Sequence, residues 1–334
     1  MVEYVAKRLL LLVVTMVGVL TLTFFLSHVV PGDPARLAAG VRAKPEQVQA
    51  LRERLNLDRP ILVQYGLYLS GVFHGDLGTS IRTRKPVMQD LLDYFPATVE
   101  LTVLAMLMCI VLGIPLGVLS AVKQESPVDH LSRVTSIAAV SMPPFWLGLL
   151  LQLLFYRILG ALPASGRLDP FLSPPHHATG LYVLDSLMSG NWAALGSSLA
   201  HVILPAVALA AGSLAVVTRM TRSSLLEVIS QDYVRTARSK GVSERVVILK
   251  HALRNALMPI VTVIGLQIGV LLAGAVLTEV VFSWPGIGLY AVQSIVFVDF
   301  QSILGVTLVS ALVYSIANLG VDLLYAVIDP RIHY

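Results

Sequence analysis

Long apolar runs separated by polar segments dominate the pattern of this chain. Six of these runs carry no charged residue and reach the roughly 20 residues that an α-helix needs to cross a bilayer. They are Leu9–Val30, Leu101–Val122, Val134–Tyr156, Leu199–Thr218, Ala256–Thr278 and Ser302–Val321. The pattern therefore predicts an all-α polytopic membrane protein with six transmembrane helices.

The first apolar run follows Lys7-Arg8, is longer than the core of a signal peptide and lacks a clear small-residue cleavage site. We therefore expect a retained helix that begins in the cytoplasm. Six spans then place both termini in the cytoplasm. The connections expected inside carry more lysine and arginine than the short outer ones, which agrees with the positive-inside rule.

The polar stretch 31–96 has helical periodicity of its own. Pro45 suits a helix start, with Val48, Leu51 and Leu55 on one face, and a second apolar stripe follows the break at residues 58–60. That stripe comprises Ile61, Tyr65, Tyr68, Leu69 and Val72, with a turn predicted at 75–78. We predict three parts: residues 1–30, a small mostly helical extracytoplasmic domain at 31–96, and a five-helix core at 97–334.

Small residues and prolines interrupt the predicted core helices. The pairs Gly113/Gly117, Gly265/Gly269 and Ala208/Gly212 lie four residues apart, a spacing that lets helices pack closely. Met142-Pro143-Pro144, Pro115 and Pro205 predict kinks or broken turns, because proline removes a backbone hydrogen bond. The connection 160–198 is rich in Pro, Gly and Ser and is expected to be loop with short helices.

The segment 219–255 is strongly basic and has helical periodicity. Gly241 predicts a helix stop within it, and Ser243 can cap a second helix. Two interpretations stay open from the spacing alone. The segment is either a solvated, positive-inside loop or a docking element for a cytoplasmic partner.

Composition adds that the chain is 56% hydrophobic and 13% charged, whereas soluble domains carry about 25% charged residues. The net charge of +4 therefore reflects membrane topology, and no nucleic-acid motif accompanies it. Cys109 is the only cysteine and is expected to be a buried core thiol.

Catalytic and metal-binding motifs are missing from the sequence, so we expect no catalytic residue, no metal site and no bound cofactor. Glu100, Glu279 and Asp322 lie at the ends of predicted spans, where water or headgroups would reach them. Structural or capping roles are expected for these three acids.

Several motifs then resemble one family. The stretches 232–241 and 251–259 are similar to the EAA loop of ABC-importer permeases, in the form used by the peptide and nickel branch. Residues 235–237 stand where the family has Glu-Ala-Ala, and Gly241 matches its glycine. Further similarity lies at residues 30–34, 74–80, 96–101 and 278–286, and is closest to the B-type subunit of dipeptide and oligopeptide importers.

This resemblance implies a type I ABC-importer permease bundle in a bacterial inner membrane. The implied partners are a second permease, two ATPase subunits that carry ATP and Mg²⁺, and an extracytoplasmic binding protein that delivers short peptides. By position, the ATPase-docking residues would be Arg235, Thr236, Ala237, Arg238, Lys240, Gly241, Leu253 and Arg254. Phe282, Trp284 and Pro285 would lie at the mouth of the pathway, although Trp284 could instead anchor at the membrane interface.

Other functions remain to be weighed. The same machinery could import nickel or another small solute. A stand-alone secondary transporter or channel would favour a mid-span carboxylate or an inverted repeat, and neither is visible. An intramembrane enzyme would need a nucleophile–base or metal pair at bilayer depth, which the sequence also lacks.

Overall fold

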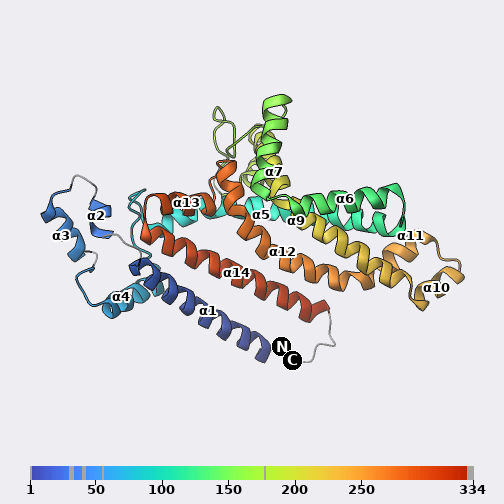
Figure 1. The fold of residues 1–334 in the computed structure, drawn as a ribbon, viewed down its shortest axis with the longest axis horizontal. Coiled ribbons are helices and arrows are strands. Elements are labelled where there is room, and N and C mark those ends of the chain that lie inside the picture. The colour runs from blue at the N-terminus through green and yellow to red at the C-terminus, as the bar shows by residue number, and fades with distance from the viewer. Residues whose placement is uncertain (1, 30–33, 40–42, 55, 177, 329–334) are drawn as a thin grey trace. The chain divides into compact units, whose positions relative to one another are not determined.

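The computed structural model describes residues 2–29, 34–39, 43–54, 56–176 and 178–328 (Figure 1). Within these ranges the regular structure is helical, apart from one isolated antiparallel bridge between Thr79 and Pro86. The predicted all-α class is confirmed for this part of the chain.

Long helices alternate with short ones. The long helices are α1 (Val2–Val29), α5 (Val87–Val122), α9 (Trp192–Ile229), α12 (Leu253–Val281) and α14 (Phe300–Ile328). The shorter α-helices are α2 (Pro34–Ala39), α3 (Pro45–Arg54), α4 (Ile61–Phe73), α6 (Pro127–Ser141), α7 (Pro144–Leu151), α8 (Tyr182–Met188), α10 (Asp232–Ser239), α11 (Glu244–Val246) and α13 (Ile287–Val296). Two π-helical turns are η1 (Gln152–Ile158) and η2 (Val247–Ala252).

Four helical segments are long and apolar enough to cross a membrane. They are α5, α9, the continuous segment Glu244–Val281 and Phe300–Val321 of α14. The pair α6 and α7–η1 supplies a fifth span if it is one broken helix. In α1 the apolar stretch found among the described residues, Leu10–Leu26, is shorter than a full span. The chain is thus polytopic, and the count of six spans stays a prediction.

The broken helix lies where the sequence predicts it. α6 ends at Ser141, α7 begins at Pro144, and the two directions differ by 107°. Met142 adopts an extended backbone (φ −93°, ψ 123°) because the ring of a following proline disfavours the helical conformation. Pro115 and Pro205 instead lie inside the uninterrupted helices α5 and α9, so no broken turn occurs there.

The structure divides into two compact units, each described separately. The first unit comprises residues 1–95 and 286–316. In it α4 packs on α1 through aromatic side chains, with the Phe24 ring stacked on Tyr68 at 5.5 Å, and the Thr21 hydroxyl lies 2.6 Å from the Tyr65 hydroxyl. The predicted start of α3 at Pro45 is confirmed, whereas Leu55 and the side chain of Leu51 lie outside the described residues. The stripe predicted on α4 is half-buried at Tyr65, Tyr68, Leu69 and Val72, but Ile61 is 41% exposed.

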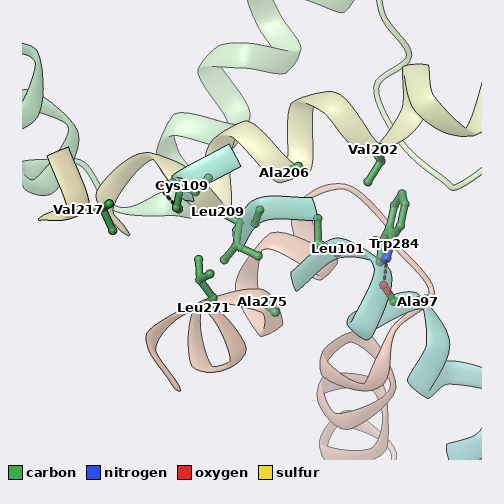
Figure 2. Close-up of a cluster of buried hydrophobic side chains, with 12 residues drawn as sticks. Ala97, Leu101, Cys109, Val202, Ala206, Leu209, Val217, Leu271, Ala275 and Trp284 are labelled. Carbon is green, nitrogen blue, oxygen red and sulfur yellow. Dashed lines mark hydrogen bonds between the residues drawn. The ribbon is translucent and has the colours of Figure 1, made fainter. Parts of the chain in front are cut away.

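The second unit comprises residues 96–285 and 317–334 and is built on α5, α9 and α12. Its core combines small and large apolar side chains from these helices with Trp284 (Figure 2). Cys109 is fully buried there and its thiol lies 3.6 Å from the Ala210 carbonyl oxygen, which confirms the prediction of a core thiol.

Small residues allow these helices to touch, as the spacing predicts. A Cβ atom placed on Gly117 would lie 2.5 Å from Cβ of Thr221 and 2.6 Å from the carbonyl oxygen of Thr218. Gly113 faces Val217 in the same way, and Gly265 faces Val321. Glycine is therefore required at Gly117 because the backbone of α9 cannot move aside.

The connection 160–198 contains α8, as expected, but α9 begins at Trp192 and not near Leu199. Asn191 caps this extra length, since its side-chain oxygen accepts a hydrogen bond from the Ala194 N–H at 3.0 Å. The capping residue was visible in the sequence, but the Pro-, Gly- and Ser-rich composition of the whole connection favoured a loop.

Candidate functional site: a basic helix–turn segment and two buried ion-pair networks

The basic segment predicted at 219–255 is partly the end of a long helix. α9 continues to Ile229, the chain turns at Ser230 and Gln231, and α10 then covers Asp232–Ser239. Val234 on α10 is fully buried, and Ala237 packs one turn later on the same face. This face rests on an apolar cluster from α5, α9, η2 and α12: Ala121, Leu225, Val247, Ile248, Ala252, Ala256 and Ile260.

Gly241 ends α10 in the way the sequence predicts. Its φ of +77° is a conformation that favours glycine. The N–H of Gly241 donates to the Arg238 carbonyl at 2.9 Å and the N–H of Val242 donates to the Ala237 carbonyl at 3.3 Å. These two bonds form a Schellman motif, which satisfies the last carbonyl groups of the helix.

The predicted cap at Ser243 is only half right. Ser243 occupies the position before α11, but its side chain makes no capping hydrogen bond. An ion pair across the turn holds the two short helices instead, with Arg238 Nε and Nη2 lying 3.1 and 2.7 Å from the carboxylate oxygens of Glu244. Sequence spacing gave no signal for this pair.

The residues expected to dock an ATPase fall on two sides of this helix–turn segment. Arg235, Thr236, Arg238, Lys240, Gly241 and Arg254 are exposed, while Ala237 and Leu253 are half-buried against the apolar cluster. Ala237 therefore lies on the face of α10 that packs on the apolar cluster. A bulky substitution at Ala237 would disturb that packing, so it cannot serve as a clean test of docking.

A buried ion pair joins three helices near this segment. Asp129 on α6 is fully buried, and its two carboxylate oxygens lie 2.7 and 2.8 Å from Nε and Nη2 of Arg222 on α9. The hydroxyl of Ser120 on α5 donates to the same carboxylate, as does the backbone N–H of Glu125. Arg222 lies one turn before Leu225, which belongs to the apolar cluster under α10.

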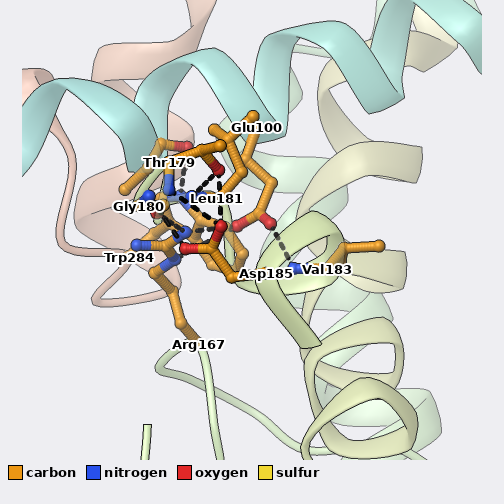
Figure 3. A network of polar contacts seen from close by, with 9 residues as sticks. Glu100, Arg167, Thr179, Gly180, Leu181, Val183, Asp185 and Trp284 are labelled. Carbon is orange, nitrogen blue, oxygen red and sulfur yellow. Dashed lines mark hydrogen bonds and ion pairs between the residues drawn. The ribbon is translucent and has the colours of Figure 1, made fainter. Parts of the chain in front are cut away.

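A second network surrounds Glu100 in the first half of α5 (Figure 3). Arg167 donates to one oxygen of Glu100 from Nε at 3.2 Å and from Nη2 at 2.5 Å, and Nη2 also donates to the Gly180 carbonyl at 3.0 Å. The other Glu100 oxygen accepts the Val183 N–H at 2.8 Å, which caps the first turn of α8. The guanidinium also lies over the Tyr182 ring at 3.9 Å.

The expected exposure of the span-end acids is wrong for two of them. Glu100 is 4% exposed and Glu279 is fully buried, where it accepts a hydrogen bond from the Thr98 hydroxyl at 2.6 Å. Their structural roles are as expected, because Glu100 pairs with Arg167 and caps α8. The Asp322 side chain lies outside the described part of the chain.

Asp185 organises the loop before α8. Its carboxylate accepts the N–H and hydroxyl of Thr179 at 2.9 and 2.7 Å and the N–H of Gly180 at 2.9 Å. Burial works to raise the pKa of Asp185, but these hydrogen bonds to the charged form outweigh it and the pKa is lowered. The ionised carboxylate therefore stabilises the loop that carries Gly180 to Arg167.

The residues expected at the pathway mouth lie in the protein interior. Phe282 and Trp284 are each 1% exposed, and Pro285 is half-buried. The Trp284 Nε1–H donates to the Ala97 carbonyl at 2.8 Å, and the Phe282 ring lies against Gly148 of α7. Burial overturns the alternative that Trp284 anchors at a membrane interface, since such an anchor faces lipid and water.

The described residues contain no group of three or more His, Cys, Asp or Glu side chains that could hold a metal ion. Phosphate-binding and nucleophile motifs are missing from the whole sequence. The features that stand out are an exposed basic helix–turn segment and two ion-pair networks, one between α6 and α9 and one between α5 and the loop before α8. These define a polytopic helical membrane protein whose helices pack through polar networks and whose basic segment can meet a partner.

Comparison with known proteins identifies the family. Residues 113–334 match the family described as binding-protein-dependent transport system inner membrane component, and residues 1–102 match its N-terminal companion. The chain belongs to this family and is a multi-pass permease component of the inner membrane. The resemblance to ABC-importer permeases is thereby confirmed.

Relatives match along almost the whole chain. The probable D,D-dipeptide transport system permease protein of Escherichia coli K12 is 51% identical over 96% of this chain and 94% of its own length. A dipeptide transport system permease protein of Alkalihalophilus pseudofirmus is 48% identical over all of both chains. A glutathione transport system permease protein of Salmonella paratyphi A is 40% identical, again over all of both chains.

Proposed function

We propose that this chain is one of two permease subunits of an ATP-driven importer of short peptides, which a binding protein delivers. The observation that carries the proposal is the exposed basic helix–turn segment on the apolar cluster of α5, α9, η2 and α12. Full-length similarity to permeases named for dipeptide transport supports the substrate class. The chain itself supplies no catalysis, and separate subunits hydrolyse ATP.

The basic segment is suited to a cytoplasmic ATPase. Its exposed cations, Arg235, Lys240 and Arg254, can meet acidic groups, and Gly241 leaves open space above the turn. Val234 fixes α10 to the cluster below, so a push on α10 reaches α9 and α12. The Arg222–Asp129 pair passes that displacement to α6, which leads to the break at Met142.

The membrane topology that fits this function has six spans and two cytoplasmic termini. α1 would be the sixth span, and the positive charge of the basic segment supports a cytoplasmic location for that segment. Residues 31–96 would then form an outer domain, of which α2, α3 and α4 are the helical parts. Phe282, Trp284 and Pro285 would close the outer mouth of the path in the state described here.

Import of nickel or another small solute by the same machinery is the second candidate. A relative that is 40% identical is named for glutathione transport, whereas the more similar relatives are named for dipeptides, so the named substrate varies within the family. The names of the relatives given above all refer to peptides, and this favours the peptide assignment. A stand-alone secondary transporter or channel is a third alternative.

Co-purification from mild detergent tests the ATPase assignment. Thr236→Trp and Arg235→Glu change exposed residues of α10, and Arg59→Glu makes the same charge change on an exposed residue of the predicted outer domain. We expect the wild-type chain and Arg59→Glu to bring down a second permease and the ATPases. The two α10 variants should keep the permease and lose the ATPases.

Two results would contradict the proposal. If the wild-type chain purifies without partners, the stand-alone transporter becomes the better explanation. If the α10 variants retain the ATPases, docking lies elsewhere on the chain.

A further inference from the structure

Arg82 of the first unit differs from three other arginines in the hydrogen bonds that its guanidinium makes. In each of the other three, Nε and Nη2 form a fork that donates to a carboxylate. The three filled forks are Arg167 on Glu100, Arg222 on Asp129 and Arg238 on Glu244. In Arg82 the same two nitrogens are buried and have no hydrogen-bond partner among the described residues.

Arg82 lies in the loop between α4 and α5, and the surrounding structure holds it in place. Its guanidinium sits over the Tyr290 ring, with Cζ 5.2 Å from the ring centre. Its backbone N–H donates to the Asp299 carboxylate at 3.3 Å. The residue as a whole is only half-buried, so the loop lies at the surface of its unit.

Two acids are close to this loop, but their carboxylates already accept hydrogen bonds from neutral groups. Asp299 accepts the Ser80 hydroxyl at 2.6 Å and the Ser302 N–H at 3.3 Å. Asp90 accepts the Tyr290 hydroxyl at 3.0 Å and the Thr83 hydroxyl. Within the described chain neither acid forms an ion pair with the Arg82 guanidinium.

An unfilled guanidinium fork in a buried position is costly, since each N–H loses water without gaining an acceptor. A carboxylate is the group that matches the planar fork, through two parallel charge-assisted hydrogen bonds. The nearby Asp90 and Asp299 would repel a doubly charged phosphate more strongly than a singly charged carboxylate. The site therefore favours a monoanionic, planar ligand.

We propose that Arg82 binds the C-terminal carboxylate of the peptide, and so makes the permease selective for peptides with a free carboxyl terminus. This inference rests on the proposed function, because it assigns a residue to the peptide of that importer. In the topology proposed above the Arg82 loop is on the outer side, where the peptide arrives. Both fork nitrogens are buried in this structure, so binding requires the loop to move outward.

Direct binding to the purified complex of permeases and ATPases, without the binding protein, tests the proposal. The probes are dialanine and dialanine C-terminal amide, with inorganic phosphate as the alternative anion, and affinity is read from the shift in melting temperature. The variants are Arg82→Gln, Arg82→Lys, which keeps the charge but loses the fork, and Arg84→Gln as an exposed control two residues away.

We expect wild type and Arg84→Gln to bind dialanine roughly tenfold more tightly than its amide, as the loss of one charge-assisted contact implies. Arg82→Gln should bind both equally, and Arg82→Lys should fall between. The proposal is overturned if Arg82→Gln keeps the wild-type preference. It is also overturned if phosphate binds Arg82 as well as dialanine does.

An internal ion pair is the competing explanation and has its own signature. Arg82→Gln would then lower the melting temperature of the peptide-free complex and leave the preference for dialanine unchanged, which also overturns the proposal. Peptide import, measured with the binding protein present, distinguishes failure of the proposed function from failure of the role proposed for Arg82. If wild type imports no peptide, the proposed function fails, whereas equal import and equal preference in wild type and Arg82→Gln refute only the role of Arg82.

Discussion

Arg167–Glu100 and Arg238–Glu244 are chemically the same ion pair in two different surroundings. The side chains of the first pair are 6% and 4% exposed, and those of the second are 39% and 56% exposed. The buried pair links α5 to a loop 67 residues away, whereas the exposed pair joins two short helices six residues apart. The first therefore holds tertiary structure together, and the second shapes a local surface.

Solvent decides what each pair contributes. Water screens the exposed pair, and such pairs contribute at most about 1 kcal/mol. Both charges of the buried pair have lost their hydration, so each depends on the other and on the backbone groups around it. The structure thus combines a buried polar network around Glu100 of α5 with a more adaptable charged segment after α9.

Glu100→Gln should show the largest difference in stability between the buried and the exposed ion pair. The change leaves the Arg167 guanidinium buried without a charged partner, which costs about 3–5 kcal/mol in comparable pairs. We expect a large fall in the melting temperature of the detergent-purified protein. Glu244→Gln is the matched control, and a similar fall for both variants would refute the distinction between the pairs.

Gly117→Ala tests the packing between the two networks. The added methyl group would overlap the backbone oxygen of Thr218, and overpacking of this kind costs about 1–3 kcal/mol. Gly196→Ala is the control because no atom lies within 4 Å of its new methyl group. Thermal unfolding should show a loss for Gly117→Ala, and equal stability of both variants would contradict the close contact.

Low pH tests the loop that supports Arg167. The folded pKa of Asp185 lies below its ordinary value of 3.8, so its ionised form stabilises the fold above about that pH. This stability is lost as the pH falls through the lowered pKa. We expect Asp185→Asn to be less stable than wild type at neutral pH, with the difference shrinking below pH 4. A difference that does not change with pH would show that the charge of Asp185 is unimportant.

Glu244→Gln should have the smallest effect on stability. The pair with Arg238 is exposed, and its loss should change the free energy of unfolding by about 1 kcal/mol or less. Binding to an ATPase is the more sensitive measurement, because the freed Arg238 changes the charge and shape of the α10–α11 turn. A large loss of stability would mean that this turn is part of the core.

Much of the helical plan was predictable because apolar periodicity and turn residues act locally. The helix start at Pro45, the end of α10 at Gly241 and the break at Met142-Pro143-Pro144 all follow from backbone restrictions of single residues. The extra turns at the start of α9 were missed because the Pro-, Gly- and Ser-rich composition of the connection 160–198 outweighed the Asn191 cap. The side-chain cap at Ser243 was wrong because the Arg238–Glu244 pair holds the turn instead.

Sequence alone thus determined the class of this protein, its apolar helices and the basic segment between two of them, because these depend on composition and local spacing. Only the tertiary structure decided which charges are buried and paired. Glu100 meets Arg167 across 67 residues and Asp129 meets Arg222 across 93, distances that no local pattern encodes. The same is true of Arg82, whose vacant fork is visible only once the surrounding side chains are in place.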